Sequence, residues 1–285
     1  MIGACIIDGV DVSTLGVIIL RGGDHGLISF PSRKEPVVIE WPEHDGFEIS
    51  DDLPFYEAKK LTVDYYLKGD ETTFLDRLNA FASLHFVSDY NSIFVREFNK
   101  TFSLRFAGIT SLKISRGFTV SGYKNARISI DYVMDNPTQF LGSGSPTTNR
   151  EPVTQVTIGT VDLSAFGIIV KEVYGTALRV SPKSRIVYNS RHENGQSAIF
   201  ASSIKREKQE ITISCAMICE DRAAFMSNWN ALWTAVNVSS LEIGLTAAGK
   251  SYKAFYKSMD GFRKRPWTNR AFAEFELNFT GYEDI

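Results

Sequence analysis

The chain repeats a short segment at a distance of 151 residues. Residues Val10–Ile18 have the sequence VDVSTLGVI, and residues Val161–Ile169 have VDLSAFGII. A repeat at this spacing predicts two units of the same fold in tandem. With 285 residues, 44% of them hydrophobic, the chain is long enough for each unit to have its own core. We expect units at 1–136 and 153–285, joined by a Gly-, Ser- and Pro-rich linker at 137–152.

Each half contains an alternating segment followed by an apolar stripe. Leu61–Leu67 and Ile211–Met217 alternate between apolar and polar residues, which predicts strands. The spacing of the stripe predicts one amphipathic helix per unit, near 72–86 and near 222–236. The stripes consist of Phe74, Leu75, Leu78, Phe81 and Ala82 in the first half, and of Phe225, Met226, Trp229, Leu232 and Trp233 in the second.

The two helices should share their caps and their core contacts. Asp70 and Asp221 precede the helices and are suited to accept hydrogen bonds from backbone N–H groups of the first turn. Leu78 and Trp229 occupy the same position in the stripe, so we expect both to be buried against their sheets. A hairpin and a closing strand follow in each half. The sequence therefore predicts a mainly β fold, a β-sandwich or barrel-like curled sheet with one helix per unit, in two tandem copies.

No catalytic or metal-binding pattern stands out. The four histidines do not have the spacing of metal ligands, and Cys215 and Cys219 lack a second pair of ligands. These two cysteines lie on one side of a predicted strand, about 13 Å apart, which is too far for a disulfide. The segment Gly22–Gly26 is better explained as a glycine-rich turn than as a catalytic loop. We expect no enzyme activity, no cofactor and no metal.

Charge and hydropathy limit the classes of partner. The formal net charge is -2, so a broad basic surface for nucleic acid is not expected. No apolar run is long enough to span a bilayer, and Met1–Asp8 is better explained as a first strand than as a signal peptide. We expect no membrane partner and no sequence-specific binding of nucleic acid.

The order of these features resembles the bacteriophage distal tail protein and, more broadly, the tail-tube domain shared by tube, distal tail and baseplate-hub proteins. The resemblance begins with the pattern hydrophobic-Asp-x-Ser-x-hydrophobic-Gly at Val10–Gly16. A Pro- and acid-rich excursion follows at Trp41–Glu57, and then come the strand Leu61–Leu67, the helix Phe74–Phe86 and the hairpin Ile93–Phe106. Through both copies the resemblance covers nearly the whole chain.

This resemblance implies a structural protein of a phage tail or tail-like assembly, encoded by a phage or a prophage. It implies a ring at the distal tail or baseplate hub, around the channel through which DNA would pass, in contact with other tail and baseplate proteins. The chain would be made in the host cytoplasm and end in the virion. A distal tail protein typically has one such domain whereas hub proteins can have two, so a trimer and a hexamer both stay open. The alternative class is a β-sandwich ligand-binding module of the carbohydrate-binding or adhesin kind.

The two copies differ in charge. Residues 1–150 hold 15 Lys and Arg against 19 Asp and Glu, while residues 151–285 hold 16 against 14. The difference is largest in corresponding excursions, and it predicts an oligomer in which an acidic side meets a basic side. Random drift of charge in solvated loops is the alternative explanation. The acidic side would comprise Glu43, Asp45, Glu48, Asp51 and Asp52, and the basic side Arg191, Lys205, Arg206 and Lys208.

A further basic group surrounds Trp267 in what we expect to be the last long loop. It consists of Arg263, Lys264, Arg265 and Arg270. The group is a candidate contact with a protein partner, although exposure to water alone or a contact with DNA would also suit it.

Overall fold

The structure is a computed structural model that describes residues 4–39, 48–49, 53–116, 123–147, 156–176, 187–188, 197–198, 208–265 and 270–284. The first sheet has seven strands, all paired antiparallel. In spatial order they are β2 (Val10–Asp11), β1 (Cys5–Ile7), β7 (Tyr90–Val95), β8 (Lys100–Arg116), β9 (Tyr123–Met134), β6 (Lys59–Asp70) and β3 (Val17–Ile19).

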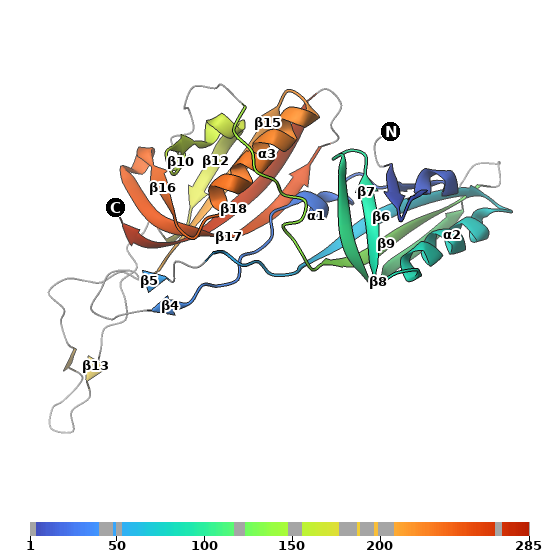
Figure 1. Cartoon of the computed structure of the whole chain (residues 1–285), viewed down its shortest axis with the longest axis horizontal. Coiled ribbons are helices and arrows are strands. Elements are labelled where there is room, and N and C mark those ends of the chain that lie inside the picture. The colour runs from blue at the N-terminus through green and yellow to red at the C-terminus, as the bar shows by residue number, and fades with distance from the viewer. Residues whose placement is uncertain are drawn as a thin grey trace.

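The second sheet repeats this order with the corresponding strands, again all antiparallel. Its strands are β11 (Val161–Asp162), β10 (Val156–Ile158), β16 (Leu241–Leu245), β17 (Lys250–Lys264), β18 (Ala271–Asp284), β15 (Gln209–Cys219) and β12 (Ile168–Tyr174). The two sheets curl, and each carries a helix against one face (Figure 1). The predicted mainly β fold is therefore confirmed.

The helices lie where the stripes predict them. In the first unit α2 (Phe74–Ser83) continues as the short helix η2 (Leu84–Phe86), and in the second α3 (Arg222–Val236) is a single longer helix. The Asp221 carboxylate accepts a hydrogen bond from the Ala224 N–H at 2.7 Å, which caps α3. The Asp70 carboxylate accepts from the Thr73 N–H at 2.8 Å, just before α2.

The repeated segment Val10–Ile18 forms the same local structure in both units. Asp11 and Asp162 cap the short helices η1 (Val12–Leu15) and η3 (Leu163–Phe166) through the N–H groups two residues on. Gly16 and Gly167 end these helices with φ of 73° and 74°, a conformation that favours glycine. The Asp and Gly residues therefore recur in both units because the same helix cap and the same positive φ angle are required in each.

Burial along the two helices is unequal. Trp229 is fully buried, as predicted, but its counterpart Leu78 is only partly buried. Leu75, which the stripe also assigns to the core, is 58% exposed. The prediction of equal burial is therefore wrong for the first unit, because the shorter α2 covers less of its sheet than α3 does. Cys215 and Cys219 are both buried, and no disulfide joins them.

The described part of the linker is attached to both units. Phe140 is buried beside Phe102 of β8, with ring centroids 5.5 Å apart. Further on, the Thr147 N–H donates to the Asn228 side chain of α3 at 2.7 Å. A Cβ at Gly144 would lie 2.8 Å from the Ala231 nitrogen, so the linker contacts α3 too closely for a larger residue. Gln139 and Phe140 thus contact the first unit, whereas residues 142–147 contact the second unit's helix.

Candidate functional site: the junction between the two units

A short helix of the first unit lies between the two sheets. After β3 the chain turns at Gly22 and forms α1 (His25–Ile28), which contacts β6 on one side and β17 on the other (Figure 1). A Cβ at Gly23 would lie 2.7 Å from the Asp64 carbonyl oxygen, so only glycine allows this close approach to β6. The segment Gly22–Gly26, which the sequence suggests is a simple turn, therefore begins the connection between the units.

The C-terminal end of α1 and the residues after it contact aromatic side chains of the second unit. The Trp229 indole N–H donates to the Ile28 carbonyl at 2.9 Å, although the two residues are far apart in sequence. The Phe30 ring packs on Trp229 and Trp233, at centroid distances of 4.5 and 5.1 Å. The Tyr256 hydroxyl donates to the Pro31 carbonyl at 3.0 Å. A stretch of the first unit thus completes the hydrophobic core of the second.

The chain continues across the second sheet before it returns. Arg33, which is buried, donates to the carbonyls of Val238 and Ser239 at 3.0 and 3.1 Å. The Tyr56 hydroxyl donates to the Asn237 side chain at 2.6 Å. Between these anchors the hairpin β4 (Val38–Ile39) and β5 (Glu48–Ile49) lies at the far end of the second unit in Figure 1.

Three buried charges meet at the centre of the junction. The Lys264 ammonium of β17 lies 3.1 Å from an Asp24 carboxylate oxygen and 2.9 Å from a Glu97 oxygen, both from the first unit. The Lys264 backbone N–H donates to His25 Nε2 at 3.3 Å. Burial raises the pKa of Asp24 above its ordinary value, and the nearby ammonium only partly offsets that effect. The three residues lock the units together as an ionic triad, defined here as Asp24, Glu97 and Lys264.

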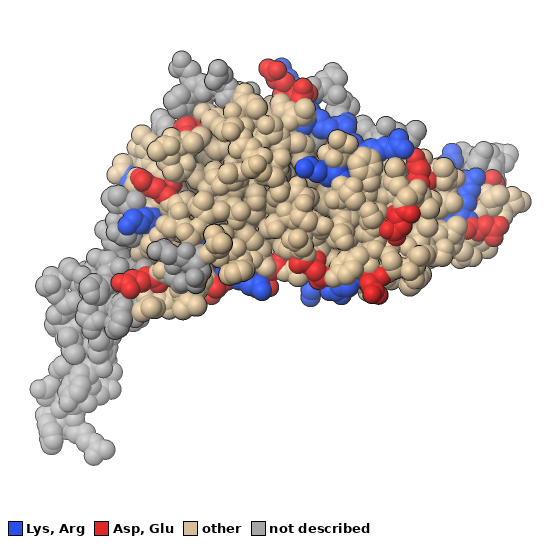
Figure 2. All heavy atoms as spheres, in the orientation of Figure 1, with Lys and Arg blue, Asp and Glu red and all other residues tan. Residues whose placement is uncertain are grey.

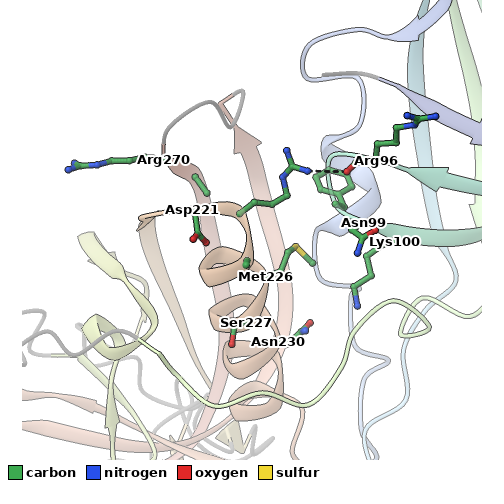
Figure 3. Close-up of a pocket in the computed structure, with 12 residues that line it drawn as sticks. Arg96, Asn99, Lys100, Asp221, Met226, Ser227, Asn230 and Arg270 are labelled. Carbon is green, nitrogen blue, oxygen red and sulfur yellow. Dashed lines mark hydrogen bonds between the residues drawn. The ribbon is translucent and has the colours of Figure 1, made fainter. Parts of the chain in front are cut away.

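A cavity of about 800 Å³ opens beside the triad, between the β7–β8 turn and the start of α3 (Figure 3). Arg222 lines the cavity, and its guanidinium donates to the Arg96 carbonyl at 3.1 Å. Among the described residues, its lining contains one hydroxyl side chain, Ser227, and no imidazole, and one carboxylate, Asp221, which caps α3. These groups form no pair of nucleophile and base.

Other buried titratable groups pack within the hydrophobic cores of the two units. Burial raises the pKa of Cys5 and that of Cys215 to about 12, so these thiols are protonated and poorly nucleophilic at neutral pH. His85 lies 2.7 Å from the Tyr132 hydroxyl, and burial lowers the pKa of its imidazole. Within the described residues no group of three potential metal-ligating side chains is found.

The predicted acidic and basic sides are only partly within the described residues. Glu48 is exposed on β5, and Lys208 is exposed just before β15. The other members lie outside the described residues, namely Glu43, Asp45, Asp51 and Asp52 on the acidic side and Arg191, Lys205 and Arg206 on the basic side. The contact between the two sides stays a prediction. On the face that Figure 2 shows, charged side chains of both signs form small separate groups on a largely uncharged surface.

Two members of the basic group near the C-terminus lie on a strand, whereas Arg265 and Arg270 lie between β17 and β18. Strand β17 runs to Lys264, and alternation along it turns Arg263 outward and Lys264 inward. The prediction that Lys264 contacts an outside partner is therefore wrong, because the triad uses its charge inside the chain. Arg265 lies over the Phe272 ring at 4.7 Å, Arg270 lines the cavity, and Trp267 lies outside the described residues.

The sequence patterns did not indicate that α1 and the ionic triad connect the two units. The aromatic residue at Trp229, where the first unit has Leu78, could have suggested an additional contact on the second helix. Neither Asp24 nor Glu97 carries any local sign of its ion pair, because the partner lies more than half the chain away.

No protein-family model matches this chain, and no curated protein matches it. Among the described residues, no helix is long and apolar enough to cross a membrane. A solved structure similar to this chain is SPP1 Dit (gp 19.1), described as a paradigm of the hub adsorption apparatus in phages that infect Gram-positive bacteria. The two are 12% identical, the match covers 99% of this chain and 98% of that chain, and the TM-score is 0.33. A TM-score this low does not establish a common fold.

Proposed function

We propose that the chain is a structural component of a phage tail or tail-like assembly that forms a ring at the distal tail or baseplate hub. Residues 1–136 and 153–285 would be its two tail-tube-like units, connected by 137–152. The link to tails rests on the order of sequence features that begins at Val10–Gly16. The ring would surround the tail channel, through which DNA passes, and would contact other tail proteins on its two sides.

One observation carries the proposal for a ring. The first unit inserts α1 and Phe30 into the core of the second unit, which has the same strand order. Such a contact is heterologous, since the two units use different surfaces. Heterologous contacts between like units can continue from unit to unit, and they close into a ring when the rotation permits.

The mass and shape of the purified chain test this function. Light scattering after size exclusion should give three or six chains per particle, because two units per chain then supply six or twelve units. Electron microscopy of the same sample should show rings with a central opening. A chain that stays monomeric at high concentration, or forms only compact dimers, would overturn the proposal.

A further inference from the structure

The first sheet has an exposed apolar stripe where the second sheet is covered. Ile109, Leu112 and Ile114 of β8 are 44, 47 and 52% exposed. The register places Ile109 and Leu112 opposite Ile130 and Ile128, whose side chains are buried in the core. The stripe therefore continues the core-facing side of the sheet beyond the part that α2 covers. We name Ile109, Leu112 and Ile114 the β8 stripe.

The counterparts of the β8 stripe are buried in the second unit. Ile114 is paired with Ala126 on the neighbouring strand, and Lys264 is paired with Ala273, which is the counterpart of Ala126. Ile114 in the first unit therefore corresponds to Lys264 in the second. The same comparison pairs Ile109 with Met259 and Leu112 with Phe262, which are 7 and 9% exposed.

The cover on the second sheet is supplied partly by its own helix and partly by the first unit. The His25 ring of α1 meets the Phe262 ring edge-on at 6.2 Å, and Asp24 pairs with Lys264. The Trp229 ring of α3 lies 5.2 Å from Phe262. The first sheet receives no corresponding segment from the described part of the chain, and this leaves the β8 stripe exposed.

Charge supports the same comparison. The counterparts of the triad residues Glu97 and Lys264 are Ala247 and Ile114. Both turns that contain Glu97 and Ala247 place four residues between paired strand positions, so the correspondence is unambiguous. Both charges are replaced together by uncharged residues. A junction built from the replacements would bury no unpaired charge.

We infer that the β8 stripe binds the second unit of another copy of this chain, in the arrangement that joins the first unit to the second within one chain. The partner would present the surface around Ala247, and Ala247 is exposed as such a contact requires. This inference rests on the proposed function and specifies the surface that joins one chain to the next.

Substitution of Ile114 tests the inference, because the residue is half exposed and a polar replacement should therefore leave the single chain folded. Ile114→Lys would bury an unpaired ammonium at the contact and should raise the Kd for self-association roughly a hundredfold. The combination Ile114→Lys with Ala247→Glu recreates the Lys264–Glu97 pair between chains and should recover much of the affinity. Val87→Lys is the matched control, since Val87 is 78% exposed in the same unit.

Sedimentation velocity over a range of concentrations, with circular dichroism to verify folding, separates the outcomes. Dissociation by Ile114→Lys, recovery in the double variant and no effect of Val87→Lys support the inference. If Ile114→Lys assembles as tightly as the wild type, or if the double variant assembles no more tightly than Ile114→Lys, the inference is overturned and the ring proposal stands. A monomeric wild-type chain overturns both.

Discussion

The two units share one strand order but differ in what covers their sheets. In the second unit, α3, α1 and Phe30 cover the sheet, and Trp229 is fully buried. In the first unit the corresponding face keeps the β8 stripe exposed. The second unit thus receives a segment of the first, while the first unit keeps the β8 stripe exposed. The difference teaches that a repeated fold does not imply repeated burial, because burial also depends on the neighbour of each copy.

The charges follow the same division. At the junction within the chain, Lys264 meets two carboxylates where the first unit has Ile114 at the corresponding position. A buried ionic triad contributes little net stability compared with apolar packing, but it strongly penalises an arrangement that leaves one member unpaired. The triad therefore favours the pairing of the first unit with the second inside one chain over other pairings.

The largest expected effect compares the two helices. Trp229→Ala should lower the free energy of unfolding by ~3–5 kcal/mol from lost packing, with ~1 kcal/mol more because the Ile28 carbonyl loses its donor. Leu78→Ala should cost about 2 kcal/mol, the lower end for a core leucine, since Leu78 is only partly buried. Urea unfolding measures both values. Equal losses would show that the two helices are packed alike, contrary to the structure.

The next effect compares Lys264 with its counterpart. Lys264→Met should cost ~3–5 kcal/mol, because the buried Asp24 and Glu97 lose their shared cation. Ile114→Met in the first unit should change stability by ~0.5 kcal/mol or less in the monomeric state, since the side chain is exposed. Both are measured by chemical unfolding at neutral pH. A tolerated Lys264→Met would mean that the triad is solvated.

A smaller effect concerns the pH dependence of the triad. Burial raises the folded-state pKa of Asp24, so this carboxyl binds its proton more tightly in the folded chain than in the unfolded one. Its contribution to stability therefore falls as the pH rises from the unfolded-state value near 3.8 through the folded-state value. The Asp24→Asn variant has no carboxyl group at this position, so its stability should not show this decrease with pH.

The difference in unfolding free energy, wild type minus Asp24→Asn, should therefore decrease as the pH rises above about 4, by less than the ~3–5 kcal/mol cost of Lys264→Met. Denaturant titrations at several pH values measure it. A difference that rises with pH would mean that Lys264 lowers the pKa of Asp24 more than burial raises it.

The smallest effect per residue concerns the acidic and basic sides. Asp51→Lys with Asp52→Lys should weaken assembly at low salt, and adding Lys205→Glu with Arg206→Glu should partly restore it. Each exposed pair contributes only ~0–1 kcal/mol, so the effect should fade at high salt. Sedimentation at two ionic strengths checks this. Assembly that ignores both sets of reversals would assign the charge difference to drift in solvated loops.

Much of each unit could be predicted from local patterns. Alternation located β6 and β15, the stripes located α2 and α3, and the repeat implied that both halves share one topology. These features depend on residues that are close in sequence, so hydrophobic periodicity and capping chemistry suffice to identify them. The helix stripe overestimated the burial of Leu75, because periodicity gives the face of a helix and not the extent of the sheet beneath it.

The sequence by itself determined the repeated segment, the mainly β composition of each unit and the position of its helix. Only the tertiary structure decided that α1 crosses to the second sheet, that Lys264 is an internal ion-pair partner and that the β8 stripe lacks cover. These outcomes depend on contacts between residues as distant as Asp24 and Lys264. Local propensity carries no information about such pairs, because their stability comes from burial and charge compensation that exist only once both units are folded and docked.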